Sequence, residues 1–132
     1  MILVDTSVWI DFFRSGAYKA EMERLVRQSQ LVMHPFLVAE LALGSLQDRR
    51  QTLAHLERLP QLPVVTLREV RQMIEARKLY SKGIGLTDAH LIASCLATPG
   101  TQIWTGDKRL GSVAALLGIG ANLSDATLSG LQ

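Results

Sequence analysis

Four acidic residues of this chain stand where their carboxylates can meet around one metal ion. Asp5 directly follows an apolar, β-prone run, Ile2–Val4, and Glu40 lies inside a stretch that is otherwise apolar. Asp88 and Asp107 each stand at the start of a segment with helical spacing. Carboxylates gathered without a counter-charge raise one another's pKa, and a hard divalent cation relieves that repulsion. The pattern predicts a Mg²⁺ or Mn²⁺ site made of oxygen ligands.

Each acid also has a purely structural explanation. The three aspartates stand at predicted helix starts, where a carboxylate caps a helix or interacts favourably with its dipole. Thr6 or Ser7 can cap the first helix instead, which leaves Asp5 free for a ligand. Glu40 in a buried helix must be paired, protonated or metal-bound, because an isolated buried charge is costly. A buried arginine partner is the structural alternative for Glu40.

These acids need elements that bring them together, and the chain alternates strand-like with helix-like segments. The β-prone runs are residues 2–4, 31–33, 64–66 and 101–104, with 119–123 as a further edge strand. Helices are predicted over 6–14, 18–28, 36–46, 48–59, 68–82, 88–97 and 107–117. We expect the third of these helices to be buried on nearly all sides, and Thr87 to cap the sixth. The alternation predicts an α/β fold with a central parallel sheet of four to five strands, flanked by helices on both sides. Ligands of such sheets gather beyond the carboxyl ends of the strands.

Length and composition predict a single globular domain over residues 1–132, in which 119–132 form an uncertain edge strand and tail. Apolar residues make up 48% of the chain, and no apolar run is long enough to span a bilayer. One cysteine excludes an internal disulfide framework and favours a reducing compartment, so we expect a cytoplasmic protein. The net charge of +2 permits a nucleic-acid partner without demanding one.

Four short motifs, in this order and spacing, resemble the PIN-domain ribonucleases, in particular the VapC-type toxins of bacterial toxin-antitoxin pairs. The motifs are Val4–Ile10, Ala39–Leu41, Thr87–Ala93 and Thr105–Lys108, and the resemblance extends from Met1 to about Leu117. The chain departs from the family pattern at Gly106, where Asn or Arg is frequent, and at Leu110, where an aromatic residue is frequent.

The resemblance implies a Mg²⁺- or Mn²⁺-dependent endoribonuclease that hydrolyses phosphodiester bonds of RNA. It also implies inhibition by a cognate antitoxin and assembly as a homodimer. It assigns the metal-binding and catalytic acids to Asp5, Glu40, Asp88 and Asp107, with Asp5 and Asp88 as direct ligands. The single domain is then PIN-like.

Neighbouring polar residues are expected to support these acids. The hydroxyls of Thr6, Ser7 and Thr105 can hydrogen-bond a carboxylate or its bound water. Cationic side chains near the acids are candidate contacts to RNA phosphates, although each can equally be a solvated surface charge; they are Arg14, Lys108 and Arg109.

Two other functions are compatible with parts of the pattern. A non-catalytic PIN-like binding module would keep the fold to bind its antitoxin or RNA without cleavage. A phosphoacceptor receiver domain also places acids and Mg²⁺ at strand ends, but it carries adjacent acids after the first strand, where Asp5 stands alone. Cleavage of RNA with added Mg²⁺ or Mn²⁺ distinguishes the enzyme from both.

Overall fold

Three short parallel strands form the centre of this computed structural model, which describes residues 1–123. They are β1 (Ile2–Val4), β2 (Leu31–Val32) and β3 (Gln102–Trp104), in the order β2-β1-β3. All three residues of β1 are buried, as expected for a central strand covered on both faces. Val4 of β1 pairs with Trp104 of β3, so the two strands end side by side and the residues that follow them are neighbours.

The prediction of four to five strands was wrong, because the described residues contain three. Residues 64–66 form no strand and lead instead into a helix. The Thr66 hydroxyl caps the first turn of this helix by accepting a hydrogen bond from the Glu69 amide at 3.1 Å. The expected edge strand at 119–123 is reduced to a single parallel bridge between Ile103 and Gly120. The rest of the predicted tail, 124–132, lies outside the described residues.

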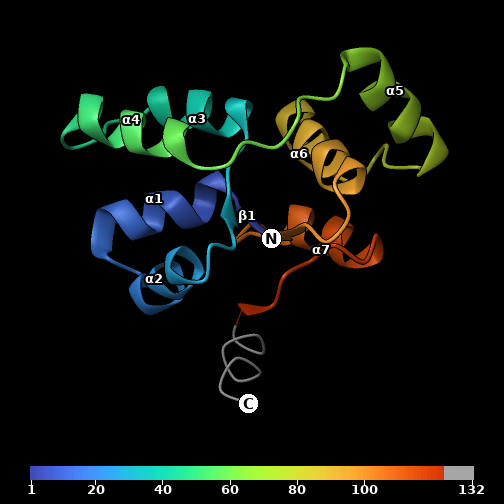
Figure 1. Ribbon diagram of the computed structural model, residues 1–132. Coiled ribbons are helices and arrows are strands. Elements are labelled where there is room, and N and C mark those ends of the chain that lie inside the picture. Colours follow the sequence, from blue (N-terminus) through green and yellow to red (C-terminus); the bar gives the residue numbers. More distant parts are fainter. Residues whose placement is uncertain (124–132) are drawn as a thin grey trace.

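Seven helices surround the strands in the described part of the chain. They are α1 (Thr6–Ser15), α2 (Lys19–Arg27), α3 (Pro35–Ala42), α4 (Arg49–Arg58), α5 (Leu67–Ala76), α6 (Leu86–Ala97) and α7 (Lys108–Leu116). Figure 1 shows α1 and α2 on the left of the strands, α6 and α7 on the right, and the α3–α4 pair above α1. The α/β class and the helices on both sides agree with the sequence prediction.

Several helix ends differ from their predicted positions. The third helix ends at Ala42 and not at residue 46, and Leu43 after it is 89% exposed, so the expectation of a helix buried almost all round was wrong. The sixth helix begins with Gly85 at its N-cap position and not with Thr87. Likewise Asp5, and neither Thr6 nor Ser7, occupies the N-cap position of α1. Local propensity located these helices but not their first and last residues.

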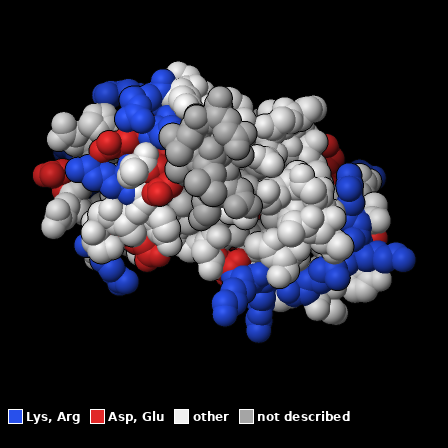
Figure 2. Space-filling model, turned by 90° about the horizontal axis from the view of Figure 1, so that it is seen from below, with Lys and Arg blue, Asp and Glu red and all other residues white. Residues whose placement is uncertain are grey.

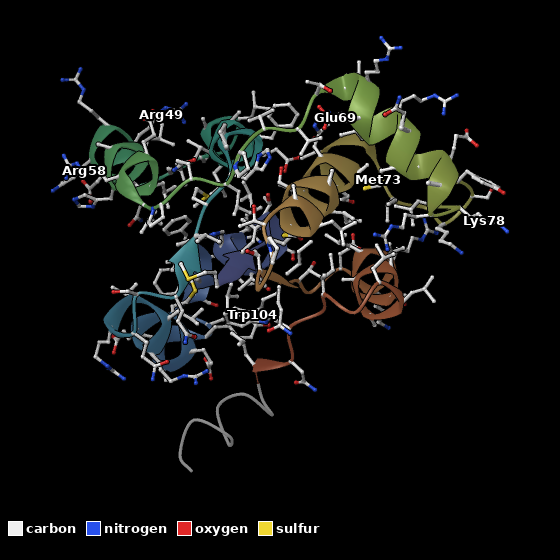
Figure 3. The ribbon with its side chains drawn as sticks, turned by 45° about the vertical axis from the view of Figure 1, so that its right-hand side comes forward. Arg49, Arg58, Glu69, Met73, Lys78 and Trp104 are labelled. Atoms are coloured by element: carbon white, nitrogen blue, oxygen red, sulfur yellow. The ribbon has the colours of Figure 1, made fainter. Side chains whose placement is uncertain are left out.

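One continuous apolar core joins the strands to α6 and α7. Its fully enclosed side chains include Leu3, Leu91 and Ile103. A smaller cluster lies between α5 and α6, and the half-buried side chain of Met73 contacts both clusters. Figure 3 shows Met73 between these two helices, so α5 is attached to the domain through α6.

A buried histidine connects α3 to α6. Nδ1 of His34 accepts a hydrogen bond from the Phe36 amide at 3.0 Å and so caps α3, while its Nε2 lies 3.0 Å from the Ser94 hydroxyl on α6. Because Ser94 donates its proton to the Pro63 carbonyl at 2.7 Å, Nε2 of His34 must be the donor to Ser94. Burial, and then the nearby charge of His90, lower the pKa of His34 to about 4. The ring is therefore neutral and held in one tautomer.

This histidine makes stability depend on pH. The pKa of His34 is lowered in the folded chain, so its contribution is complete above the unfolded pKa of about 6.5 and is lost as pH falls toward about 4. Between pH 7 and pH 5 the wild type should lose about 2 kcal/mol of unfolding free energy through His34. His34→Asn, which keeps a capping oxygen, should lack this loss. Urea unfolding at the two pH values measures the difference, and parallel curves for both proteins would contradict it.

Candidate active site

Asp5 is held at the end of β1 by two hydroxyls from different segments. Its Oδ2 accepts hydrogen bonds from Thr105 at 2.7 Å and from Ser7 at 3.0 Å. Both hydroxyls are themselves oriented, because they accept the backbone amides of Asp107 and Gly106 at 3.0 Å. The Asp5 side chain makes no cap bond to α1 although it stands at the N-cap position, and it is 6% exposed. Its Oδ1 has no hydrogen-bond donor among residues 1–123, so it remains available to a ligand.

Glu40 lies near the end of α3 and is linked to the start of α1. Its Oε1 accepts a hydrogen bond from the Thr6 hydroxyl at 3.0 Å. The sequence left open a buried arginine partner for Glu40, but among residues 1–123 its hydrogen-bond partner is Thr6 and no ion pair involves it. Glu40 is half-buried, so the α3 position keeps this carboxylate in contact with both the protein and solvent.

Asp107 has the helix-capping role that the sequence allowed. It is the N-cap of α7, and its Oδ1 accepts the amides of Arg109 at 2.8 Å and Leu110 at 3.0 Å. Oδ2 takes no part in the cap. Since Thr105 bonds both the Asp5 carboxylate and the Asp107 amide, one hydroxyl ties these two acids together.

Asp88, in the first turn of α6, shows that the four acids form one electrostatic cluster. Burial first, and then the Asp5 carboxylate, raise the pKa of Asp88 to about 6. A backbone hydrogen bond from Gly85 lowers this pKa, while the charges of Asp107 and Glu40 raise it. Every other acid predicted for the site therefore repels negative charge on Asp88.

The donor set fits a hard divalent cation. The cluster offers carboxylate oxygens, and within residues 1–123 the ion pairs are Lys19–Glu23 and Arg71–Glu75, both outside it. No group of three acidic, histidine or cysteine side chains in that range is placed to hold one ion. Mg²⁺ is usually held by one or two carboxylates and keeps several waters, so it does not require three protein ligands. The arrangement thus fits a largely hydrated ion better than an all-protein cage.

The predicted phosphate contacts lie in two different places. Lys108 and Arg109 form the first turn of α7 and line a cavity of about 430 Å³ together with Lys82. Arg14 lies in the last turn of α1 and lines another cavity, with Glu40. Figure 2 shows Lys and Arg side chains gathered along one edge of the lower face, on the side of α5 and α7.

Lys82 was missed by sequence reasoning, because it stands in a loop more than twenty residues from its partners. The glycine next to Lys82 is the feature of the sequence that relates to this arrangement. A Cβ on Gly83 would lie only 2.7 Å from Cδ of Arg109, so a side chain at this position would collide with Arg109. Gly83 has a φ of 79° and lets the Arg109 side chain lie across the loop beside Lys82. The loop before α6 and the start of α7 therefore present their cations together.

Comparison with known proteins matches both sequence and fold. Residues 2–116 match the family model of the PIN domain. The chain is 42% identical over 119 residues to Ribonuclease VapC32 from two strains of Mycobacterium tuberculosis, covering 90% of this chain and 94% of that protein. It also resembles the crystal structure of PAE2754 from Pyrobaculum aerophilum, with a TM-score of 0.64, 17% identity, and coverage of 99% of this chain and 96% of that one. The last likeness concerns the fold alone.

The coupling between Asp5 and Asp88 can be measured directly. Asp5→Asn removes the charge that, after burial, contributes most to the raised pKa of Asp88, so this pKa should fall below its wild-type value of about 6. Carboxyl-carbon NMR titration of the metal-free protein gives both values. The variant should be at least as stable as the wild type without metal, because a repulsion is lost while the side chain keeps an oxygen acceptor. An unchanged Asp88 titration would show that the two acids do not interact.

Proposed function

The chain belongs to the PIN-domain family, in its VapC type, and we propose that it is a metal-dependent endoribonuclease toxin that hydrolyses phosphodiester bonds of RNA. The observation that carries the proposal is the electrostatic coupling of Asp88 to Asp5, Asp107 and Glu40. Carboxylates held this way without an ion pair suit Mg²⁺ or Mn²⁺, with Asp5 and Asp88 as the direct ligands.

The divalent ion, when bound, supplies a lowered pKa for a coordinated water and neutralises charge on the scissile phosphate. The chain's own residues provide the geometry. Thr105 and Ser7 fix one oxygen of Asp5 and leave the other without a hydrogen-bond donor among residues 1–123. Asp88, with a pKa of about 6, is mostly ionised at pH 7, and a nearby cation lowers that pKa further. Asp88 is therefore charged under the conditions of the reaction.

Glu40 and Asp107 are the candidates to orient the attacking water or accept its proton. Glu40 keeps Oε2 outside its bond to Thr6, and Asp107 keeps Oδ2 outside its cap of α7. Each carboxylate is thus held by one oxygen and offers the second. The Asp107 cap also means that a substitution there affects α7, whereas Glu40 can be changed with less effect on the fold.

Lys108 and Arg109 are proposed to contact RNA phosphates together with Lys82. Two cations in the first turn of α7 oppose the helix dipole, which favours negative charge at that end. No ion pair neutralises any of the three in the part of the chain that the structure describes. A bound phosphate would satisfy both the cations and the helix end.

A cognate antitoxin as inhibitor and a homodimer as the working assembly are further parts of the proposal, supported by membership of this family. No helix among residues 1–123 is long and apolar enough to cross a membrane. The family match argues against the receiver-domain alternative. A non-catalytic binder remains the competing function, and the acids at all four motif positions favour the enzyme over it.

Removing either proposed ligand should abolish cleavage without unfolding the chain. Asp5→Asn or Asp88→Asn should reduce RNA cleavage more than about 100-fold, since even a residue that only supports a metal ligand typically contributes 10–100-fold. Calorimetric Mn²⁺ binding should be lost in parallel, with an unchanged circular dichroism spectrum. Asp11→Asn, which removes an exposed acid from α1, is the matched control and should behave as wild type. Cleavage by purified protein that resists a chelator would contradict the proposal.

Binding of RNA should depend on salt through the α7 cations. In the Asp5→Asn protein, the further substitutions Lys108→Gln and Arg109→Gln remove two positive charges. The slope of log affinity against log salt concentration should then become shallower by about 0.7 for each charge removed. Arg58→Gln is the control, because Figure 3 shows Arg58 on α4, well apart from α7. Fluorescence anisotropy with a single-stranded RNA at several salt concentrations measures the slopes. Equal slopes for all three proteins would exclude these phosphate contacts.

A further inference from the structure

We propose that the cavity between α1 and the α3–α4 loop binds one nucleobase of single-stranded RNA, next to the phosphate that is cleaved. This inference rests on the proposed ribonuclease function. The cavity has a volume of about 780 Å³. The lining residues that matter here are Phe13 and Arg14 from α1, Glu40 from α3, and Gln47, Asp48 and Thr52 from the loop and α4.

Glu40 links the cavity to the other acids. This residue lines the cavity, bonds Thr6 beside Asp5, and contributes to the raised pKa of Asp88. An RNA phosphate at Asp5 and Asp88 therefore has the cavity beside it. A nucleotide bound there places its base next to the reacting bond, where it can select the cleavage position.

Phe13 provides a stacking surface on one wall. Its ring packs on Trp9 with the ring centres 5.5 Å apart and the planes 26° apart. Trp9 is buried, whereas Phe13 is 38% exposed, so the phenyl ring is held from behind and still reaches solvent. Proteins recognise unstacked RNA bases by stacking them on such aromatic rings. A neighbouring arginine plane, here Arg14, is the other group that stacks well on bases.

The charges of the cavity favour a base over a phosphate. Glu40 and Asp48 place two carboxylates against the single cation of Arg14. This balance repels a phosphate but accepts an uncharged base. Among residues 1–123, the lining of the cavity at Lys82, Lys108 and Arg109 includes three cations and no acid, which suits the phosphate backbone. The cavity beside Phe13 thus suits the base of a nucleotide, and the cavity beside Lys82 suits its phosphate.

Polar groups on the opposite wall are placed to contact the edge of a base. The Gln47 side chain carries both a donor and an acceptor. The Thr52 hydroxyl donates to the Gln47 carbonyl at 3.0 Å and keeps an oxygen that can accept a hydrogen bond from a base. Donors and acceptors beside a stacking surface are what sequence-dependent reading of a base requires.

The loop that carries these groups is fixed to α4. The Arg49 guanidinium donates to the carbonyl of Ala42, the last residue of α3, and to that of Gly44 in the loop that follows. Figure 3 shows Arg49 at the start of α4, facing this loop. The cavity is therefore preformed, as small-ligand sites usually are. An apolar segment of an inhibitory protein is the alternative occupant, but the mixed polar lining and the carboxylate at its inner end favour a base.

The test uses Asp5→Asn protein, which is expected to bind RNA without cleaving it, and short oligoribonucleotides carrying 2-aminopurine at successive positions. Fluorescence should be quenched at one position when the probe stacks in the cavity. Phe13→Leu in the same background should abolish that quenching and weaken binding about tenfold, and Phe13→Tyr should restore both. Leu43→Ala, which removes an exposed apolar side chain outside the cavity lining, is the control and should match the parent.

The results separate this inference from the function on which it rests. Quenching that is the same in the Phe13→Leu and parent proteins overturns the base site, even when wild-type protein cleaves RNA. The base site is also overturned if Phe13→Leu weakens only the binding of an inhibitory protein. If wild-type protein cleaves no RNA with Mn²⁺, the proposed function itself fails. Unfolding curves for each variant confirm that a lost signal reflects the cavity and not the fold.

Discussion

The register between β1 and β3 determines the position of the acid site. Val4 pairs with Trp104, so the chain leaves both strands at the same level and Asp5 meets Thr105 directly. A shift of one residue would turn the Asp5 side chain to the other face of the sheet and break its bonds to Thr105 and Ser7. Core packing of Leu3 and Ile103 maintains this register, so the same apolar contacts that stabilise the fold also align the carboxylates.

Acidic, cationic and largely uncharged groups occupy different regions around this site. Four carboxylates lie together without an ion pair among the described residues, which costs stability when no cation is bound. Three cations gather beside them on the α7 side, and a mixed aromatic and polar cavity lies on the α1 side. An RNA chain offers a complement to each region: phosphates for the cations, an uncharged base for the cavity, and a metal-bridged phosphate for the acids.

Much of this could be predicted from the sequence, because the first strand, the helices and the polar residues at strand ends have strong local signals. The four acids were predicted from their places at strand ends or on apolar helix faces, and in the structure the charges of the other three raise the pKa of Asp88. The strand predicted at 64–66 does not form, because a strand needs a hydrogen-bonding partner and the Leu62 amide already donates to the Met33 carbonyl beside β2. In addition, Thr66 and Glu69 form a helix-capping signal that outweighs the β propensity of this segment. Lys82 stands in a loop that no periodic pattern specifies, and the cavity beside Phe13 combines residues of α1, α3, α4 and a loop that only the tertiary fold brings together.

The bond between His34 and Ser94 also has a mechanical consequence. It fastens the beginning of α3 to the second half of α6, and these two helices carry Glu40 and Asp88. Thr105 joins Asp5 to the backbone of Asp107 at the strand ends, and Thr6 joins Glu40 to the start of α1. Side chains that carry no charge themselves therefore connect the segments on which the acids stand, so a change at one of these neutral residues would disturb the acids without altering any of them.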